Sequence, residues 1–142
     1  MNIDLETVRN YFSKDHFAVN AGTVIDAAAE DCVQCSMEIT PNHLNIGGGV
    51  QGGAIFTLAE LAFAVHCNLP LACGEDTGLT VGQSCNITFL RGAKGKRLIA
   101  KSICLLKGGS ISVYRISVED DLGIIIAEMY GNAYATGRKI SG

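Results

Sequence analysis

Residues 43–68 read HLNIGGGVQGGAIFTLAELAFAVHCN, a glycine-dense loop that leads directly into an almost wholly apolar segment. The apolar part contains few polar side chains: Thr57, Glu60, His66 and Asn68. An apolar run of this length is typical of a helix, and a helix that is apolar on every side has to be buried on every side. A small domain can provide that burial by curving a sheet around the helix.

The length and charge of the chain limit the classes of protein it can belong to. Its 142 residues are typical of one domain that buries most of its apolar surface, so we expect a single domain over residues 1–142. The formal net charge of -3 argues against general binding to nucleic acid or to an anionic membrane. The N-terminus lacks a basic start followed by an apolar run, which predicts a cytoplasmic protein without a signal peptide.

The six cysteines do not have the pattern of a disulfide framework or of a metal site. In the absence of an export signal, reduced thiols packed as small hydrophobic side chains are expected. Cys32 and Cys35 form a CxxC, but they lie in an alternating segment, where residues three apart point to opposite faces of a strand. Because no second CxxC completes a zinc site, we expect no metal ligands.

A short helix and two strands are predicted before the glycine loop. Apolar residues at helical spacing behind Asp4, a suitable N-cap, predict a helix over residues 4–13. Strand patterns follow at residues 23–28 and 32–40.

The C-terminal half has the pattern of an antiparallel meander. Strand-like segments cover residues 79–90, 97–107, 110–120 and 123–136, and turns with hairpin chemistry separate the later ones. Pro70 is expected to end the apolar helix. Since a parallel sheet would need a helix between successive strands, this order predicts an α+β domain in which a curved antiparallel sheet wraps the helix at residues 54–68.

The glycines at residues 47–52 fit the pattern G-x-G-x-x-G, but they do not predict a dinucleotide site. The residues before them are not a strand, no parallel crossover follows, and the Lys-Ser/Thr pair of a P-loop is absent from the sequence after them. Gly52 and Gly53 are nevertheless expected to leave backbone N–H groups unobstructed at the positive end of a helix. This helix end is therefore a candidate oxyanion site.

Glu60 is the one carboxylate in the apolar helix, on the same stripe as Gly53, Thr57 and Ala64. A buried charge is costly unless something compensates for it. One interpretation is a structural ion pair with an arginine or a place in a subunit interface. The other is catalysis, because burial raises the pKa and the basicity of a carboxylate and the helix terminus could hold an electrophile nearby. The residues alone leave both interpretations open.

Residues 43–68 resemble the signature of hotdog-fold acyl-CoA thioesterases, in the branch that includes phenylacetyl-CoA thioesterase and a 4-hydroxybenzoyl-CoA thioesterase. The resemblance continues through VGQSCNITFLRGAKGKRLIAKS at residues 81–102, which is similar to the third-strand region of that family. It implies a hotdog fold and hydrolysis of an acyl-CoA or aryl-acyl-CoA thioester, with CoA as part of the substrate and no separate cofactor. It also implies a homodimer or homotetramer whose active sites are shared between subunits.

The resemblance assigns roles to particular residues. It implies that Glu60 is the catalytic base or nucleophile, that the amide of Gly52 polarises the thioester carbonyl, and that Asn45 positions water or the carbonyl. Gln51 stands where the family usually has a histidine, and glutamine cannot change charge near neutral pH. Ala64 stands where one branch has a threonine that contacts the substrate or water. The candidate substrate contacts on the helix stripe are Gly53, Thr57 and Ala64.

Basic residues around the turn after residue 90 are candidates for contacts with the phosphates of CoA, although a solvated hairpin explains them equally well. They are Arg91, Lys94, Lys96 and Arg97. His43 is expected to fix the shape of the glycine loop, and His66, roughly on the far side of the helix from Glu60, is expected to be a core or interface residue.

Two other functions remain open from the sequence. A non-catalytic acyl-CoA-binding or regulatory module is favoured by the departures at Gln51 and Ala64. An enoyl-thioester hydratase would need a histidine beside the acid, and the glycine loop with Gln51 argues against it.

Overall fold

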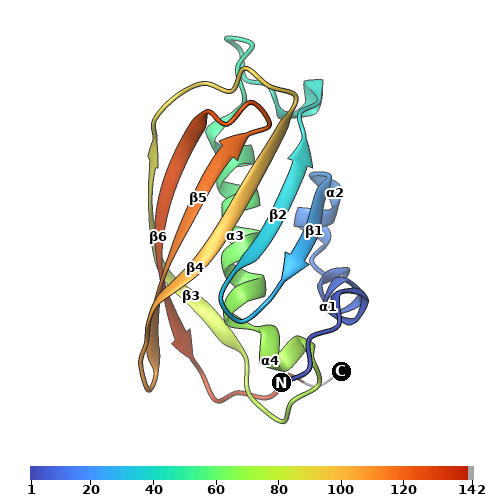
Figure 1. Cartoon of the computed structure of the whole chain (residues 1–142), viewed down its shortest axis with the longest axis vertical. Helices are drawn as coiled ribbons and strands as arrows, with labels where there is room; N and C mark the ends of the chain where they lie inside the picture. Colours follow the sequence, from blue (N-terminus) through green and yellow to red (C-terminus); the bar gives the residue numbers. More distant parts are fainter. Residues whose placement is uncertain (141–142) are drawn as a thin grey trace.

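A six-stranded antiparallel sheet curves around one long helix, α3 (Gly52–Cys67), in the computed structural model, which describes residues 1–140 (Figure 1). The strands are β1 (Thr23–Ala28), β2 (Val33–Glu38), β3 (Thr80–Phe89), β4 (Arg97–Lys107), β5 (Ile111–Asp120) and β6 (Ile125–Ala135). The other helices are α1 (Leu5–Phe12), α2 (His16–Asn20) and α4 (Leu69–Ala72), and a 3-10 turn covers Pro41–His43. This is the α+β arrangement predicted from the sequence. None of the helices within residues 1–140 has the length and apolar character that crossing a membrane requires.

The order of the strands is β1-β2-β4-β5-β6-β3, and all neighbours are antiparallel. The predicted meander is therefore correct for β4, β5 and β6 but wrong for β3, which pairs with β6 at the far edge of the sheet. The reason is that residues 90–96 do not form a tight turn between neighbours. They carry the chain across the end of the sheet from one edge to its middle (Figure 1).

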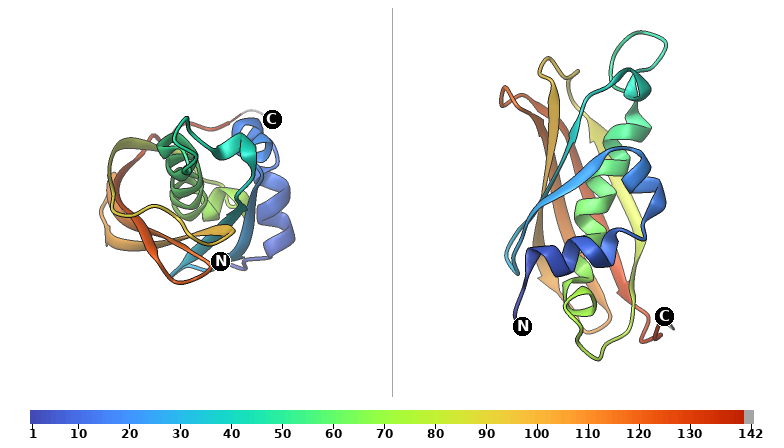
Figure 2. Two further views of the ribbon diagram at one scale, coloured as in Figure 1. Left: turned by 90° about the horizontal axis from the view of Figure 1, so that it is seen from above. Right: turned by 90° about the vertical axis from the view of Figure 1, so that its right-hand side faces the viewer.

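The ends of α3 differ from those predicted. The helix begins at Gly52 and ends at Cys67, and Pro70 does not end it but lies in the first turn of α4, where proline is tolerated. Asn68 is the C-cap, and its side chain also bonds the backbone N–H and carbonyl of Thr80 at 2.9 and 2.8 Å. The same residue thus ends the helix and fixes it to the start of β3. The sequence patterns also missed α2, which together with α1 lies beside β1 (Figure 2).

Phe63 of α3 is a large side chain of the core, with 1% of its surface exposed. Its ring centroid is 5.5 Å from that of Tyr114 on β5. A Cβ atom added at Gly131 of β6 would lie 2.8 Å from this ring, and one added at Gly82 of β3 would lie 3.1 Å from it. The absence of side chains at these two strand positions therefore makes the space that Phe63 occupies.

Replacing Gly131 by Ala is expected to lower the free energy of unfolding by about 1 to 3 kcal/mol, because the new methyl group overpacks against the buried ring of Phe63. Urea unfolding at one protein concentration measures the change. Gly109→Ala is the matched control, since a Cβ atom there meets nothing within 4 Å. Equal stability of the two variants would contradict this view of the core.

One stripe of α3 is not covered by the chain's own sheet. Gly53 is exposed, and Thr57, Glu60 and Ala64, at helical spacing behind it, are each partly exposed. The expectation that this helix is buried on every side is wrong for this stripe, although the rest of the helix is buried as predicted. The uncovered stripe carries the one carboxylate of α3 and several of the candidate site residues.

Candidate active site

The glycine loop before α3 is shaped by Asn45. Its side-chain Oδ1 accepts the N–H of Gly47 at 2.9 Å and of Gly49 at 3.1 Å, and its backbone N–H donates to the carbonyl of Gly49. Gly48 has φ of 84°, in the left-handed region that favours glycine. Because the oxygen of Asn45 is used in the loop, the Nδ2 amide is the part of this side chain that can bind a substrate.

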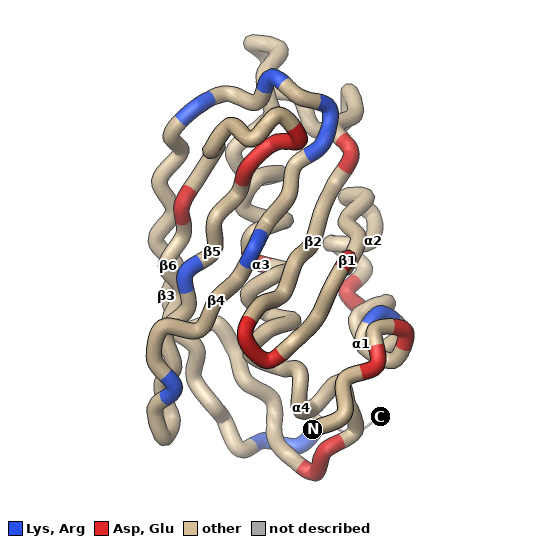
Figure 3. The backbone as a smooth tube through the Cα atoms, in the orientation of Figure 1, with Lys and Arg blue, Asp and Glu red and all other residues tan. Residues whose placement is uncertain are grey.

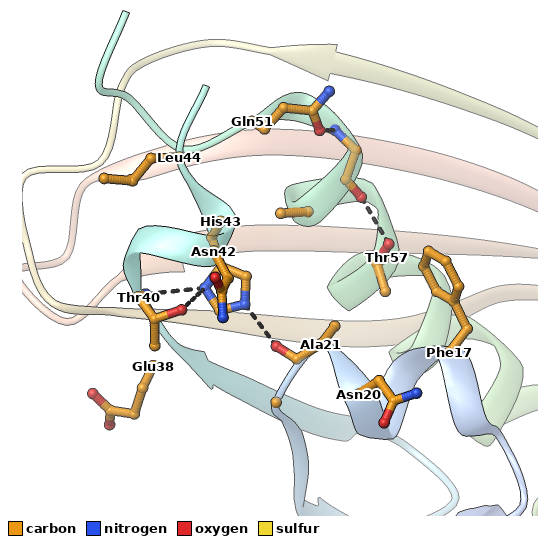
Figure 4. Close-up of a pocket in the computed structure, with 13 residues that line it drawn as sticks. Phe17, Asn20, Ala21, Glu38, Thr40, Asn42, His43, Leu44, Gln51 and Thr57 are labelled. Atoms are coloured by element: carbon orange, nitrogen blue, oxygen red, sulfur yellow. Dashed lines mark hydrogen bonds between the residues drawn. The ribbon is translucent and has the colours of Figure 1, made fainter. Parts of the chain in front are cut away.

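Gln51 is the N-cap of α3, and its side chain bends back over the start of the helix (Figure 4). Its Oε1 accepts the N–H of Gly53 at 2.5 Å. The expectation that both glycine amides are open is therefore wrong for Gly53. The N–H of Gly52 donates to no acceptor within residues 1–140, so it is the free amide at this helix end.

A hollow of about 590 Å³ lies beside the start of α3, between this helix, α2 and the 3-10 turn. Thr57 lines it from α3 and Phe17 from α2, with His43 on the third side (Figure 4). The hydroxyl of Thr57 donates to the carbonyl of Gly53 at 2.7 Å. Its methyl group and the ring of Phe17, which is 76% exposed, give the hollow a partly apolar wall.

His43 fixes the shape of the loop, as expected. Its Nδ1 accepts the backbone N–H of Thr40 at 3.0 Å, and its Nε2 donates to the carbonyl of Ala21 at 2.6 Å (Figure 4). Both ring nitrogens are thus bonded to the protein, and the ring joins the loop to the end of α2.

Glu60 is an isolated carboxylate. Burial, together with the negative charge of Asp15, raises its pKa above the usual value of 4.5. No lysine or arginine within residues 1–140 forms an ion pair with it, so the structural ion pair considered above is not present there. The charge of Glu60 is also felt by Cys85 of β3, whose thiol pKa is raised by burial and by this carboxylate. Glu60 therefore lies within electrostatic reach of both Cys85 on β3 and Asp15 before α2.

Glu60 and Gly52 do not come together within one chain. They are separated by two turns of the same helix, roughly 12 Å along its axis. The sequence patterns gave no sign that Cys85 and Asp15 would approach Glu60, because that proximity depends on the pairing of β3 with β6 and on the missed helix α2.

The basic residues after β3 divide into two groups. Arg97 begins β4, where its Nη2 lies 3.5 Å from Asp26 Oδ1 and donates to the hydroxyl of Ser36 at 3.1 Å. Arg91, Lys94 and Lys96 are exposed, and none has a carboxylate partner within residues 1–140. Figure 3 shows the basic segments of this loop across the end of the molecule where α3 begins. The structure thus brings these three cations, but not Arg97, into a free surface near the glycine loop.

His66 is a core residue, as expected, with 5% of its surface exposed. Its Nδ1 accepts the hydroxyl of Ser102 at 3.0 Å and its Nε2 donates to the carbonyl of Glu30 at 2.8 Å. This bonding suits the neutral ring. Burial lowers the pKa of His66 below its usual value of 6.5, although the hydrogen bond to the backbone carbonyl of Glu30 opposes the shift.

The lowered pKa of His66 predicts a loss of stability in mild acid. The unfolded chain binds a proton at this histidine near pH 6.5 and the folded protein only at lower pH, so stability is complete above about pH 6.5 and falls as the pH drops toward the folded pKa. Urea midpoints measured from pH 7.5 to pH 5 should fall more steeply in the wild type than in His66→Gln, which lacks this titration. Parallel pH profiles would contradict the prediction.

The six-stranded antiparallel sheet curved around α3 is a hotdog fold. A family model described as the thioesterase superfamily matches residues 47–127, and the chain belongs to this family. An acyl-coenzyme A thioesterase named PaaI from Escherichia coli is 30% identical over 133 residues, which cover 92% of this chain and 90% of the relative. A candidate esterase from Deinococcus radiodurans is 34% identical over 97 residues, which cover 68% of this chain and 61% of that relative's length.

A solved structure of the E. coli PaaI protein from the phenylacetic acid degradation operon is similar along nearly the whole chain. The TM-score is 0.84 at 26% identity, and the match covers 96% of this chain and 95% of the other. These comparisons confirm the family and the hotdog fold predicted from the sequence. They also confirm that the protein is an enzyme of the acyl-CoA thioesterase class.

Proposed function

We propose that the protein hydrolyses an acyl-CoA or aryl-acyl-CoA thioester to the free acid and CoA, with Glu60 as general base or nucleophile and the Gly52 amide as oxyanion donor. The observation that carries this proposal is the isolated carboxylate on the uncovered stripe of α3, whose pKa is raised by burial. A thioester carbonyl develops negative charge on its oxygen as it is attacked. A preorganised N–H donor such as the free Gly52 amide is worth about 3 to 4 kcal/mol to that transition state.

The proposed site is shared between two subunits, because Glu60 and Gly52 of one chain are too far apart to act on one carbonyl. Two observations support a dimer. β3 is an edge strand, so one row of its backbone groups has no strand partner within residues 1–140. Apolar side chains at Ile46 and Phe89 are also exposed, to 110% and 51%. A second copy paired along β3 would cover these groups and bring Glu60 of one subunit toward Gly52 of the other, and two such dimers would form a tetramer.

The proposed reaction needs no histidine. Glu60 takes a proton from water as the water attacks the carbonyl, or it attacks directly and forms an anhydride that water then hydrolyses. The C–S bond breaks and CoA leaves as a thiolate, which is a far better leaving group than an amine and needs no general acid. The free side-chain amide groups closest in sequence to the Gly52 amide are those of Asn45 and Gln51, and we propose that they orient the substrate or water.

Release of free thiol from a panel of acyl-CoA and aryl-acyl-CoA thioesters tests the proposal, and turnover of at least one of them is expected. Tight binding of acyl-CoA without turnover would instead favour the non-catalytic module, which the use of Gln51 as a helix cap also fits. Hydration of an enoyl-CoA, followed as loss of conjugated absorbance, would favour the hydratase. The protein bonds on both ring nitrogens of His43 and His66 argue against that alternative.

A further inference from the structure

The aspartates at the β5–β6 turn lie beneath the basic loop, defined here as residues 90–96. Asp120 is 1% exposed, and its Oδ2 accepts the backbone N–H of Lys94 and of Gly95, both at 2.9 Å. Its Oδ1 accepts two further N–H groups at 3.0 Å from its own turn, those of Leu122 and Ile124. Although burial opposes ionisation of Asp120, these four donors together hold its pKa below the usual value.

Asp121 extends the contact between the β5–β6 turn and the basic loop. Its Oδ1 accepts the N–H of Lys96 at 2.8 Å and of Arg97 at 3.3 Å. A Cβ atom at Gly95 would collide with this carboxylate, so the loop can lie against the turn only with glycine at that position. The aspartate pair, Asp120 and Asp121, therefore fixes the backbone of the basic loop while leaving the side chains of Lys94 and Lys96 exposed to solvent.

Two grooves connect the basic loop to the start of α3. A groove of about 410 Å³ runs from Gly52 past the ring of Phe89 to Arg91. A second groove, of about 660 Å³, begins at Arg91 and is lined further along by Lys94 and by the β5–β6 turn. Both grooves include Arg91 and Gly92, so a continuous surface leads from the free Gly52 amide to Arg91 and Lys94.

We propose that Asp120 and Asp121 are positioning residues that hold the basic loop in the shape that binds the phosphates of an acyl-CoA, whose pantetheine arm lies in the groove from Gly52 to Arg91. The inference rests on the proposed function. The hollow on the other side of the helix start is lined by Glu38 and contains no lysine or arginine, which makes it a poor site for phosphates. Arg91, Lys94 and Lys96 have no carboxylate partners within residues 1–140. Arg91 donates one hydrogen bond to the neutral carbonyl of Ile125 at 3.3 Å, so the charges of all three residues are available to phosphates.

The test compares two thioesters of the same acyl group, one of CoA and one of pantetheine, which lacks the nucleotide phosphates. In the wild type the KM should be lower for the CoA ester at low salt, and added salt should raise only that KM. Asp120→Asn should raise the KM for the CoA ester about tenfold, the scale of one charge-assisted hydrogen bond, with kcat and the pantetheine ester little changed. The double variant Lys94→Ala/Lys96→Ala should also raise the KM for the CoA ester, without disturbing the β5–β6 turn. If Asp120→Asn fails to fold, this double variant tests the proposal.

Lys101→Ala is the matched charge control, because Lys101 pairs with Glu119 on β4 and β5, away from both grooves. It should leave both KM values unchanged. Equal losses on both esters in Asp120→Asn, or an unchanged KM for the CoA ester in the lysine variants, would overturn the proposal while leaving the thioesterase function intact. Absence of turnover of either ester by the wild type would overturn the proposed function itself.

Discussion

Replacing Glu60 by Gln is expected to lower kcat for thioester hydrolysis by at least about a hundredfold, the loss typical of removing a general base. Glutamine keeps the size of the side chain and its place on the uncovered stripe, but it can neither take a proton from water nor attack a carbonyl. The measurement is thiol release under saturating acyl-CoA. In the wild type, kcat should rise with pH as Glu60 ionises, above the usual carboxylate value of 4.5, since burial raises its pKa.

The same substitution is expected to stabilise the protein near neutral pH. Because the pKa of Glu60 is higher in the folded than in the unfolded chain, its contribution to stability is complete below about pH 4.5 and is lost as the pH rises through the folded pKa. Glutamine does not ionise, so Glu60→Gln does not lose this stability as the pH rises. Its Tm should therefore match or exceed that of the wild type at pH 7, with the difference shrinking toward pH 4.

These two results together separate catalysis from structure. Removing a carboxylate that forms a structural ion pair destabilises the fold. Removing a carboxylate that is retained for catalysis lowers activity but not stability. Glu6→Gln, a matched charge change on the exposed face of α1, should alter neither kcat nor Tm appreciably. Undiminished turnover in Glu60→Gln would remove Glu60 from the mechanism.

The sequence predicted the elements of the fold well where the pattern was local. The alternation through residues 32–40 correctly predicted a strand, in which Val33, Cys35 and Met37 are buried. The isolated Glu60 marked the helix that carries the candidate site. What it missed depends on contacts between distant segments. The pairing of β3 with β6 requires residues 90–96 to cross the sheet end, and hairpin-like glycines give no sign of this.

The site was also predictable only in part, for a physical reason. A free amide at the start of a glycine-led helix follows from sequence, but which amide is free depends on the rotamer of Gln51, whose oxygen takes the N–H of Gly53. The role of Asp120 depends on the β5–β6 turn lying against a loop about 25 residues away in the chain. Composition and spacing carry no information on either contact.

Replacing Gly52 by Pro is expected to lower kcat by about a hundredfold to a thousandfold, because it deletes the proposed oxyanion donor and leaves the helix intact. Gly52 is the first residue of α3, where proline is favoured, since the N–H it lacks has no partner within the helix. The preceding residue, Gln51, has φ of -67° and ψ of 136°, the extended backbone that proline requires before it. Circular dichroism and Tm should confirm that the helix is retained.

Gly52→Ala is the control that isolates the N–H group. The Cβ atom of alanine, like that of proline, would lie 3.1 Å from the far end of the half-exposed Phe89 ring, which can move. Alanine, unlike proline, keeps the backbone N–H. We expect a much smaller loss of kcat in the alanine variant, with any steric effect of the new carbon visible as a raised KM in both variants. If alanine and proline reduced kcat equally, the space beside Phe89 and not the amide would limit the reaction. The helix terminus would then be a surface for binding rather than the donor that stabilises the transition state.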